Sequence, residues 1–328
     1  MSLRRDHLSI PSFSGGAPRK IPILTVEGSQ PGPTVVITAN IHGDEVTGLG
    51  AIHSLSHSLV SSIQCGRIHL YPSLNPDGLA ARTRKVPPDG QDLNRLFPGQ
   101  AQGSPVERMA HVIWDDLVSR EPEVVIDLHA DSPISIPYAI TDRAVSLQGS
   151  ERQRLEGKCE SLAQASGLTV LREYPDDQYT HHGLQHSLAG AITNDLHIPA
   201  ITIECGPRLY IDARAVEVVE HAVLGMLAAQ GLLQHKTEPH ASRIQGGPWK
   251  RGAGPRASVA GVVHHLVSPG AKVSRGQAVA EIRSLAGDPL ERLCMQEAGF
   301  VISLTERAWV GPGVSACTLA TAEAPRRD

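Results

Sequence analysis

The chain has 328 residues, long enough for one large domain and a smaller second one. Its 30 basic and 34 acidic residues give a net charge of −4 without long blocks of either sign, which argues against a nucleic-acid or membrane surface and favours a small-molecule or peptide partner. The five cysteines form no CxxC pair, so we expect reduced thiols rather than disulfides or a thiolate zinc cluster.

The chain offers no segment that we expect to cross a membrane. The N-terminal sequence has no apolar core, and the apolar run AVLGMLAAQGLL near residue 228 is shorter than the ~20 residues that span a bilayer. We therefore predict a cytoplasmic protein. Whether it forms a homo-oligomer stays open at this point.

Up to about residue 235, short β-rich runs alternate with longer helical patterns, which predicts an α/β sheet covered by helices. One helix start is well marked, because Ser104 can cap it, Pro105 suits its first position and Glu107 completes a capping box. We predict this helix over residues 105–119. The β-rich runs are TVVITANI, RIHLYPSL, VVIDLHA, LTVLREY and AITIECG.

The segment 236–256 is rich in Gly, Pro and basic residues and predicts a linker. We therefore expect an α/β domain at 1–240 and a second domain at 241–328. The second region contains two related β segments, 261–282 and 299–319, which predict a small all-β domain. It resembles the half-barrel of biotinyl and lipoyl carrier domains. No lysine lies between Arg275 and Phe300, so we expect a structural or lid role instead of a carrier role.

The sequence NIHGDEVTG directly follows a β-rich run and contains His42 and Glu45 at the H-x-x-E spacing of metal ligands. Taken alone, this segment is more typical of a polar helix start, where acidic residues complement the helix dipole. A metal site needs a third ligand, and His129 is the best candidate because it also ends a β-rich run. Open α/β sheets bind ligands at such strand ends, and two histidines with one glutamate are a catalytic zinc pattern.

Glu204 lies at the end of a further β-rich run, in AITIECGP. A carboxylate at this rim can act as general base toward a metal-bound water, although a salt-bridged structural glutamate is the plain alternative. The polar loop 75–99 holds three arginines. Arginine suits a substrate carboxylate because its planar fork donates two parallel hydrogen bonds, and Asn94 beside Arg95 could add a third donor.

The motifs HGDE, NPDG followed by an arginine, DLNR with FPG, DLH and ECGP occur in the order seen in zinc carboxypeptidases, and DLNR and ECGP most resemble the succinylglutamate desuccinylase and aspartoacylase branch. The resemblance spans roughly residues 33–210. It implies a mixed twisted sheet with helices on both faces and one Zn²⁺ per chain. It implies zinc ligation by His42, Glu45 and His129, proton transfer by Glu204, carbonyl polarisation by Arg84 and a carboxylate clamp by Asn94 with Arg95.

Three features depart from the family pattern, the first being the spacer KVPPDGQ, which looks longer than in the family. Arg82 could exchange roles with Arg84 if the register of the loop shifts. Asp44 replaces an asparagine common in aspartoacylases, and no residue of the sequence matches a second substrate-side arginine or tyrosine of the family.

Other histidines carry weaker signals. His53 and His57 have helical i, i+4 spacing but flank an apolar stripe, so we expect a helix surface. His181 and His182 lie in a polar stretch that is either a solvated loop or a substrate loop. His264 and His265 should point to opposite faces of a strand, and Cys205 should lie near the site.

We therefore predict a zinc-dependent hydrolase that cleaves the amide bond of an N-acyl amino acid, in the manner of a desuccinylase or aspartoacylase. Two alternatives stay open. One is a zinc metallocarboxypeptidase that acts on short peptides, which would need an open groove. The other is a non-enzymatic binding module on the same fold, which would be favoured if Glu204 pointed away from the site.

Overall fold

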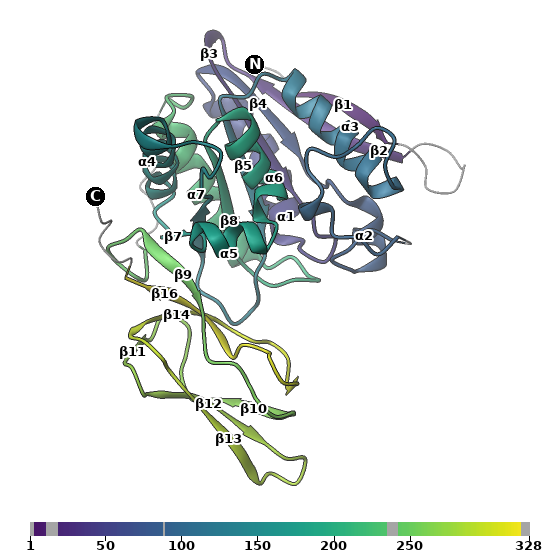
Figure 1. Ribbon diagram of the computed structural model, residues 1–328. Coiled ribbons are helices and arrows are strands. Elements are labelled where there is room, and N and C mark those ends of the chain that lie inside the picture. Colours follow the sequence, from purple (N-terminus) through teal and green to yellow (C-terminus); the bar gives the residue numbers. More distant parts are fainter. Residues whose placement is uncertain (1–2, 11–18, 88, 235–241, 323–328) are drawn as a thin grey trace.

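A large mixed sheet forms the frame of the protein, as a computed structural model shows (Figure 1). The strand order is β1-β2-β4-β3-β5-β8-β6-β7-β9-β16-β14-β11. The structure describes residues 3–10, 19–87, 89–234 and 242–322. The predicted boundary between residues 240 and 241 lies outside these ranges, so the two-domain division stays a prediction.

The centre of the sheet is parallel: β3, β4, β5 and β8 run in one direction, while β6 runs antiparallel to β8 and parallel to β7. β1 and β2 form one edge of the sheet and run antiparallel, with β2 paired to β4. The bounds are β1 (Leu3–Ile10), β2 (Arg19–Glu27), β3 (Gln30–Ala39), β4 (Cys65–Tyr71), β5 (Val124–His129), β6 (Tyr138–Thr141), β7 (Thr169–Arg172) and β8 (Ala200–Glu204).

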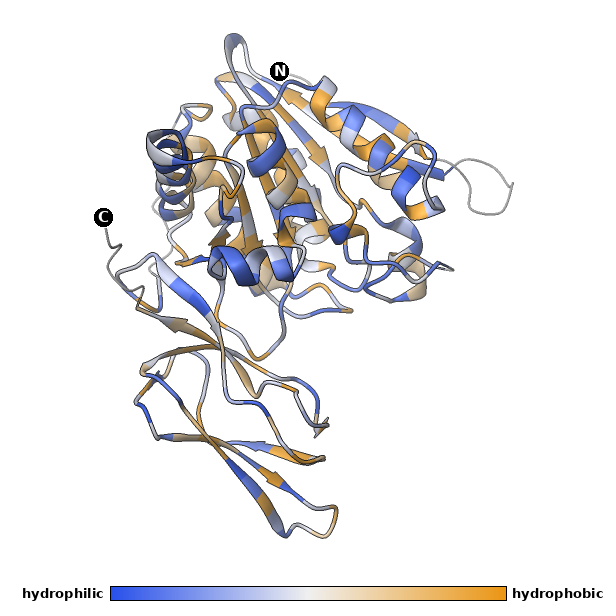
Figure 2. Ribbon diagram, viewed as in Figure 1, coloured by the Kyte–Doolittle hydropathy of each residue, from blue (hydrophilic) through white to orange (hydrophobic). Residues whose placement is uncertain are grey.

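Helices cover both faces of this sheet because the central strands are apolar on both sides. In β3, Val35 and Ile37 pack into the core under α1, α4 and α7, while the intervening Val36 packs into the core under α3 and α6. Figure 2 shows apolar strands between helices that carry polar residues on their outer faces. The helix bounds are α1 (Thr47–Ser62), α2 (Pro76–Ala81), α3 (Pro105–Ser119), α4 (Gly149–Ala165), α5 (Asp176–His181), α6 (Leu188–Ala191) and α7 (Ala213–Ala229). The predicted α/β sheet with covering helices is thus confirmed.

The predicted helix over 105–119 is confirmed as α3, with Ser104 and Glu107 forming the capping box. In α1, His53 and His57 are exposed while Ile52 and Leu55 are buried, as the apolar stripe predicts. Three short helical turns complete the list: η1 (Leu93–Arg95), η2 (Leu184–His186) and the π-helical η3 (Ile192–Leu196).

The C-terminal region is all β, as predicted, but its strands are shared between two sheets. β9 pairs with β7 and with β16, so the large sheet continues into this region, and a second sheet has the order β13-β12-β10-β15. Its likeness to a carrier half-barrel stays a prediction. The bounds are β9 (Trp249–Ala253), β10 (Gly261–His265), β11 (Lys272–Val273), β12 (Ala278–Arg283), β13 (Pro289–Cys294), β14 (Gly299–Leu304), β15 (Trp309–Val310) and β16 (Cys317–Thr321).

Among the described residues, none of the helices combines the length and apolar character that a bilayer span needs. The cytoplasmic location stays a prediction.

Candidate metal centre and active site

His42, Glu45 and His129 meet at the carboxyl ends of β3 and β5, where one ligand atom from each lies within 4.8 Å of the other two. The two strands are parallel neighbours, with Ala39 opposite Leu128, so their ends open at the same edge of the sheet. All three side chains are buried. The strand-end argument made from the sequence therefore places the three residues correctly in space.

The turn that carries His42 and Glu45 is shaped by Asn40. Its backbone has a φ of 53°, a left-handed conformation that asparagine tolerates better than most residues. Its side-chain Nδ2 donates to the carbonyl oxygens of His42, Gly43 and Glu45, each at 3.0 Å. A Cβ on Gly43 would lie 2.0 Å from the backbone of Gly78, so only glycine fits there. The turn is thus fixed by its own sequence.

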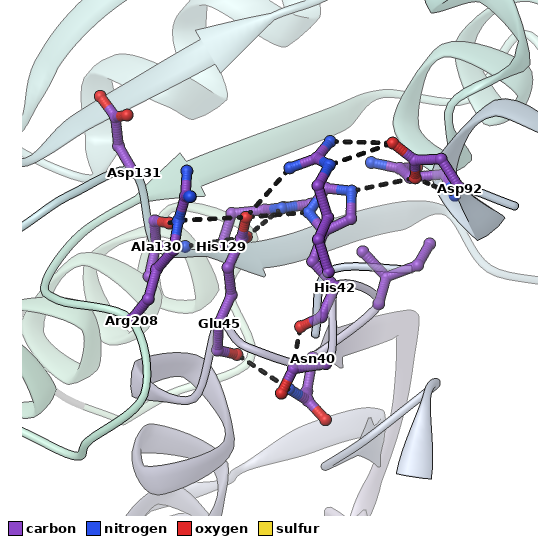
Figure 3. A network of polar contacts seen from close by, with 12 residues as sticks. Asn40, His42, Glu45, Asp92, His129, Ala130, Asp131 and Arg208 are labelled. Carbon is purple, nitrogen blue, oxygen red and sulfur yellow. Dashed lines mark hydrogen bonds and ion pairs between the residues drawn. The ribbon is translucent and has the colours of Figure 1, made fainter. Parts of the chain in front are cut away.

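The two histidines present the same ring atom to Glu45. His42 Nδ1 lies 3.0 Å from Glu45 Oε1, and His129 Nδ1 lies 2.8 Å from Glu45 Oε2 (Figure 3). Each outer nitrogen faces an aspartate instead: His42 Nε2 is 3.3 Å from Asp92, and His129 Nε2 is 2.8 Å from Asp127. Carboxylates behind metal-binding histidines fix the tautomer in this way. Both Nδ1 lone pairs can therefore face a metal.

The charges of the cluster reinforce one another. Burial raises the pKa of Glu45, but the imidazoles of His42 and His129 outweigh it and hold the pKa well below the usual range. Burial lowers the pKa of His129, yet the carboxylates of Asp127 and Glu45 hold it well above. Both ring nitrogens of His42 are buried without a well-aligned hydrogen bond to the described residues. Two imidazoles and a carboxylate, with the buried Nδ1 of His42 left for a ligand, fit a divalent cation such as Zn²⁺.

Glu204 lies beside His129, since β5 and β8 pair in register at these two residues. It lines the same cavity, of about 150 Å³, and its Oε2 is buried without a hydrogen bond from the described residues. Burial, only partly offset by His129, raises the pKa of Glu204 to about 8. A carboxyl with this proton affinity is suited to accept and return a proton near neutral pH.

The loop between β4 and α3 places two arginines, Arg84 and Arg95, at the cavity. Arg84 reaches the cavity, with Nη1 3.3 Å from Glu45 Oε1 and Nη2 3.1 Å from Asp92. Arg82 is exposed and caps the C-terminus of α2, so the structure places Arg84 and not Arg82 at the site. Arg95 also lines the cavity and donates from Nη1 to the Asn94 carbonyl at 2.6 Å.

Asn94 lines the cavity but is also a structural residue. Its Oδ1 accepts a hydrogen bond of 2.7 Å from the backbone N–H of Leu188, which ties the loop to α6. Among the described residues, its Nδ2 donates to no acceptor. Asn94 can therefore offer one donor to a substrate while its oxygen holds the loop in place.

The remaining sequence candidates lie elsewhere. His181 and His182 are exposed and do not line the cavity, which agrees with the solvated reading and not with a substrate loop. His265 donates from Nε2 to the Thr305 carbonyl oxygen at 2.9 Å in the C-terminal region. Cys205 is buried next to Glu204, and burial raises the pKa of its thiol to about 12, so it is no nucleophile. Asp44 is outside the cavity wall, and its carbonyl accepts from Leu209 N–H at 2.7 Å.

Several charged residues near the cluster, Asp131 among them, were not predicted from the sequence. Asp92 stands inside the DLNR motif and Arg208 directly follows ECGP, so their positions carried a signal. Figure 3 shows Arg208 and Asp92 on opposite sides of the two histidines. Asp142 and Glu173 follow strand ends, the same signal that identified His129. Only the last had no local signal: Arg251, on β9 far along the chain.

Comparison with known proteins decides the family. Residues 31–230 match the succinylglutamate desuccinylase/aspartoacylase catalytic domain. The chain belongs to this family. The predicted resemblance is thereby confirmed.

A curated relative is the N-alpha-acetyl-L-2,4-diaminobutyric acid deacetylase of Halomonas elongata, 37% identical over 141 residues. The match spans 42% of this chain and only 40% of that relative. Among solved structures, the product-bound ectoine utilization protein EutE (DoeB) from Ruegeria pomeroyi is similar with a TM-score of 0.83 and 19% identity, over 98% of this chain and 95% of that one. A metallo-carboxypeptidase from Burkholderia cenocepacia is similar with a TM-score of 0.53 and 17% identity, over 70% and 64%. These likenesses show a carboxypeptidase-like fold.

Proposed function

We propose that the protein is a zinc-dependent hydrolase that cleaves the amide bond of an N-acyl amino acid. One observation carries the proposal: His42, Glu45 and His129 line one small cavity together with Glu204. Family membership supports the reaction class, and the deacetylase relative supports acetyl as the first acyl group to test.

In the proposed reaction, His42, Glu45 and His129 would hold Zn²⁺, which when bound would lower the pKa of water toward ~7 and polarise a carbonyl. Glu204 takes the proton of the attacking water and passes it to the leaving amine. Arg84 donates hydrogen bonds to the oxygen on which negative charge develops. Arg95, with the Nδ2 of Asn94, binds the carboxylate of the substrate.

The shape of the cavity favours a small substrate over a peptide. Its volume is about 150 Å³, and Arg251 from the C-terminal region forms part of its wall. A carboxypeptidase would need an open groove for the chain on the other side of the scissile bond. The non-enzymatic alternative expects Glu204 to point away, but Glu204 lines the cavity.

The test pairs two variants with metal analysis. Glu204→Gln should keep zinc but lose turnover of acetyl, succinyl or formyl amino acids by several orders of magnitude, because no group would move the proton. His129→Ala should lose the zinc itself. Full activity of Glu204→Gln, or zinc retained by His129→Ala at wild-type affinity, would contradict the assignment. His53→Ala, on the exposed face of α1, is the matched histidine control.

A further inference from the structure

The cavity has a second charged end, formed by Asp142 and Glu173. Each residue directly follows a strand, and the two strands, β6 and β7, are parallel neighbours with Thr141 opposite Arg172. Both carboxylates are buried, with 5% exposure each, and both line the cavity that holds the metal residues. In β6, Tyr138 pairs with Glu204 while Thr141 pairs with Ile201. Asp142 thus lies beyond the end of β6 that is farther from Glu204.

The two carboxylates differ in their partners. Glu173 is neutralised, because Arg251 Nη1 donates to its Oε1 and the guanidinium also stacks over Tyr174 at 5.3 Å. Among the described residues, Asp142 accepts a hydrogen bond from one neutral donor alone, the Tyr179 hydroxyl, at 2.8 Å. In the part of the chain that the structure describes, no basic side chain lies within ion-pair distance of Asp142. A buried carboxylate beside a cavity therefore lacks a cation.

The electrostatics of Asp142 agree with this view. Burial, with the negative charge of Glu173, raises its pKa to about 7, although the Tyr179 hydroxyl and the more distant Arg251 and Arg95 lower it. The protein thus leaves this carboxylate short of positive charge.

Arg95 is a partly buried cation that lacks a carboxylate partner among the described residues. Its described contact is the Asn94 carbonyl, and among the described residues no carboxylate lies within ion-pair distance of its guanidinium. Burial accordingly lowers its pKa, with Asp92 and Glu173 compensating only in part. One unpaired anion and one unpaired cation therefore face the same cavity. A ligand that carries one positive and one negative group would pair with both residues.

We propose that the substrate is a mono-N-acylated diamino acid, whose carboxylate binds Arg95 and whose free ammonium group binds Asp142. The inference rests on the proposed function and adds the class of amino acid to it. It makes Asp142 the residue that selects the substrate, because a second carboxylate at this position would face a like charge, and a neutral side chain would leave Asp142 unpaired. Either the α-amino or the side-chain amino group could carry the acyl group, since both isomers present one carboxylate and one ammonium.

The test compares substrates of equal size and different charge. The zinc-loaded enzyme is assayed with Nα-acetyl-2,4-diaminobutyrate, its Nγ-acetyl isomer, the neutral isostere Nα-acetylnorvaline and the anionic N-acetylaspartate. We expect kcat/KM for one of the two cationic substrates to exceed that for the neutral one on the order of ten- to a hundredfold, the value of a buried charged contact. The anionic substrate should be the poorest.

Asp142→Asn should lower kcat/KM much more for the cationic than for the neutral substrate and bring their ratio close to one. The asparagine can still accept from Tyr179, so the fold should hold. Asp177→Asn is the matched control, because Asp177 is exposed on α5 and does not line the cavity. It should keep the wild-type ratio.

The outcomes separate the two proposals. Equal kcat/KM for the cationic and neutral substrates, or an Asp142→Asn variant that loses both alike, overturns the diamino acid inference and leaves the hydrolase standing. If no acylated amino acid is hydrolysed, the hydrolase proposal fails. Calorimetry with free 2,4-diaminobutyrate and norvaline then still tests Asp142, and equal affinity for the two would overturn its role.

Discussion

The two ends of the cavity are built on opposite electrostatic plans. At the metal end, Glu45 contacts two imidazoles, and each imidazole has an aspartate behind it. At the other end, Asp142 faces the cavity, as Arg95 does from the loop in its wall, and neither has an opposite charge in contact among the described residues. The first end is organised before any substrate arrives, whereas the second depends on the substrate for its missing charges. The difference teaches that reactivity and selectivity are carried by separate residues, which mutations can therefore separate.

The strongest test of the metal end is Arg84. Replacing it with Met removes the donor proposed for the developing oxyanion, and the loss of such a donor typically costs ~10²–10³ in kcat. Steady-state kinetics should show this fall with little change in zinc content, because Arg84 is not a proposed ligand. We expect kcat to fall equally for cationic and neutral substrates. A change in the ratio of the two would show that Arg84 also contributes to substrate selectivity.

A smaller effect is expected from the support behind the ligands. Asp127 accepts from His129 and is itself oriented by the Thr38 hydroxyl at 2.7 Å. Asp127→Asn should weaken zinc binding about 10- to 100-fold, because the amide no longer fixes the histidine tautomer as a carboxylate does. Competition with a fluorescent chelator measures this affinity. Unchanged affinity would mean that the ring is held by packing alone.

The smallest effect concerns the stability of the distal end. The pKa of Asp142 is raised to about 7 in the folded state, so the folded state binds more protons than the unfolded state between pH ~4 and ~7. Stability therefore falls as pH rises through this window. Asp142→Asn cannot ionise and should raise Tm at pH 8 but have little effect at pH 4. Thermal unfolding at both pH values measures it, and equal shifts at the two would argue against a buried, uncompensated charge.

Much of this arrangement could be predicted from sequence because it follows strand ends. The β-rich runs before His42, His129 and Glu204 predict that each residue lies at the end of a strand. Because neighbouring parallel strands end at the same edge of the sheet, the three side chains lie close together. Arg84 was favoured over Arg82 by motif spacing, although only the fold shows Arg82 turned to solvent as a helix cap. Asp142 and Glu173 carry the same strand-end signal, but neither stands in a motif such as HGDE or ECGP that would single it out.

Arg251 marks the limit of such reasoning. It lies 47 residues after Glu204, and it reaches the cavity only because β9 pairs with β7, which is a contact between segments about 80 residues apart. Backbone pairing of this kind leaves no periodic trace in either strand. The structural role of Asn94 could not be predicted either, because its hydrogen bond with Leu188 depends on how a helix distant in sequence packs.

The continuity of the large sheet through β9 has a consequence for any attempt to shorten the chain. Removing everything after residue 240 would leave β7 paired with β6 alone and expose unpaired backbone groups at its other edge, a template for aggregation. It would also take away Arg251 and leave Glu173 as a buried, uncompensated anion in the cavity wall. The last quarter of the chain thus contributes to the cavity through its first strand, β9. A fragment that contains only the residues matched by the family would be prone to aggregation and would carry an unpaired buried charge.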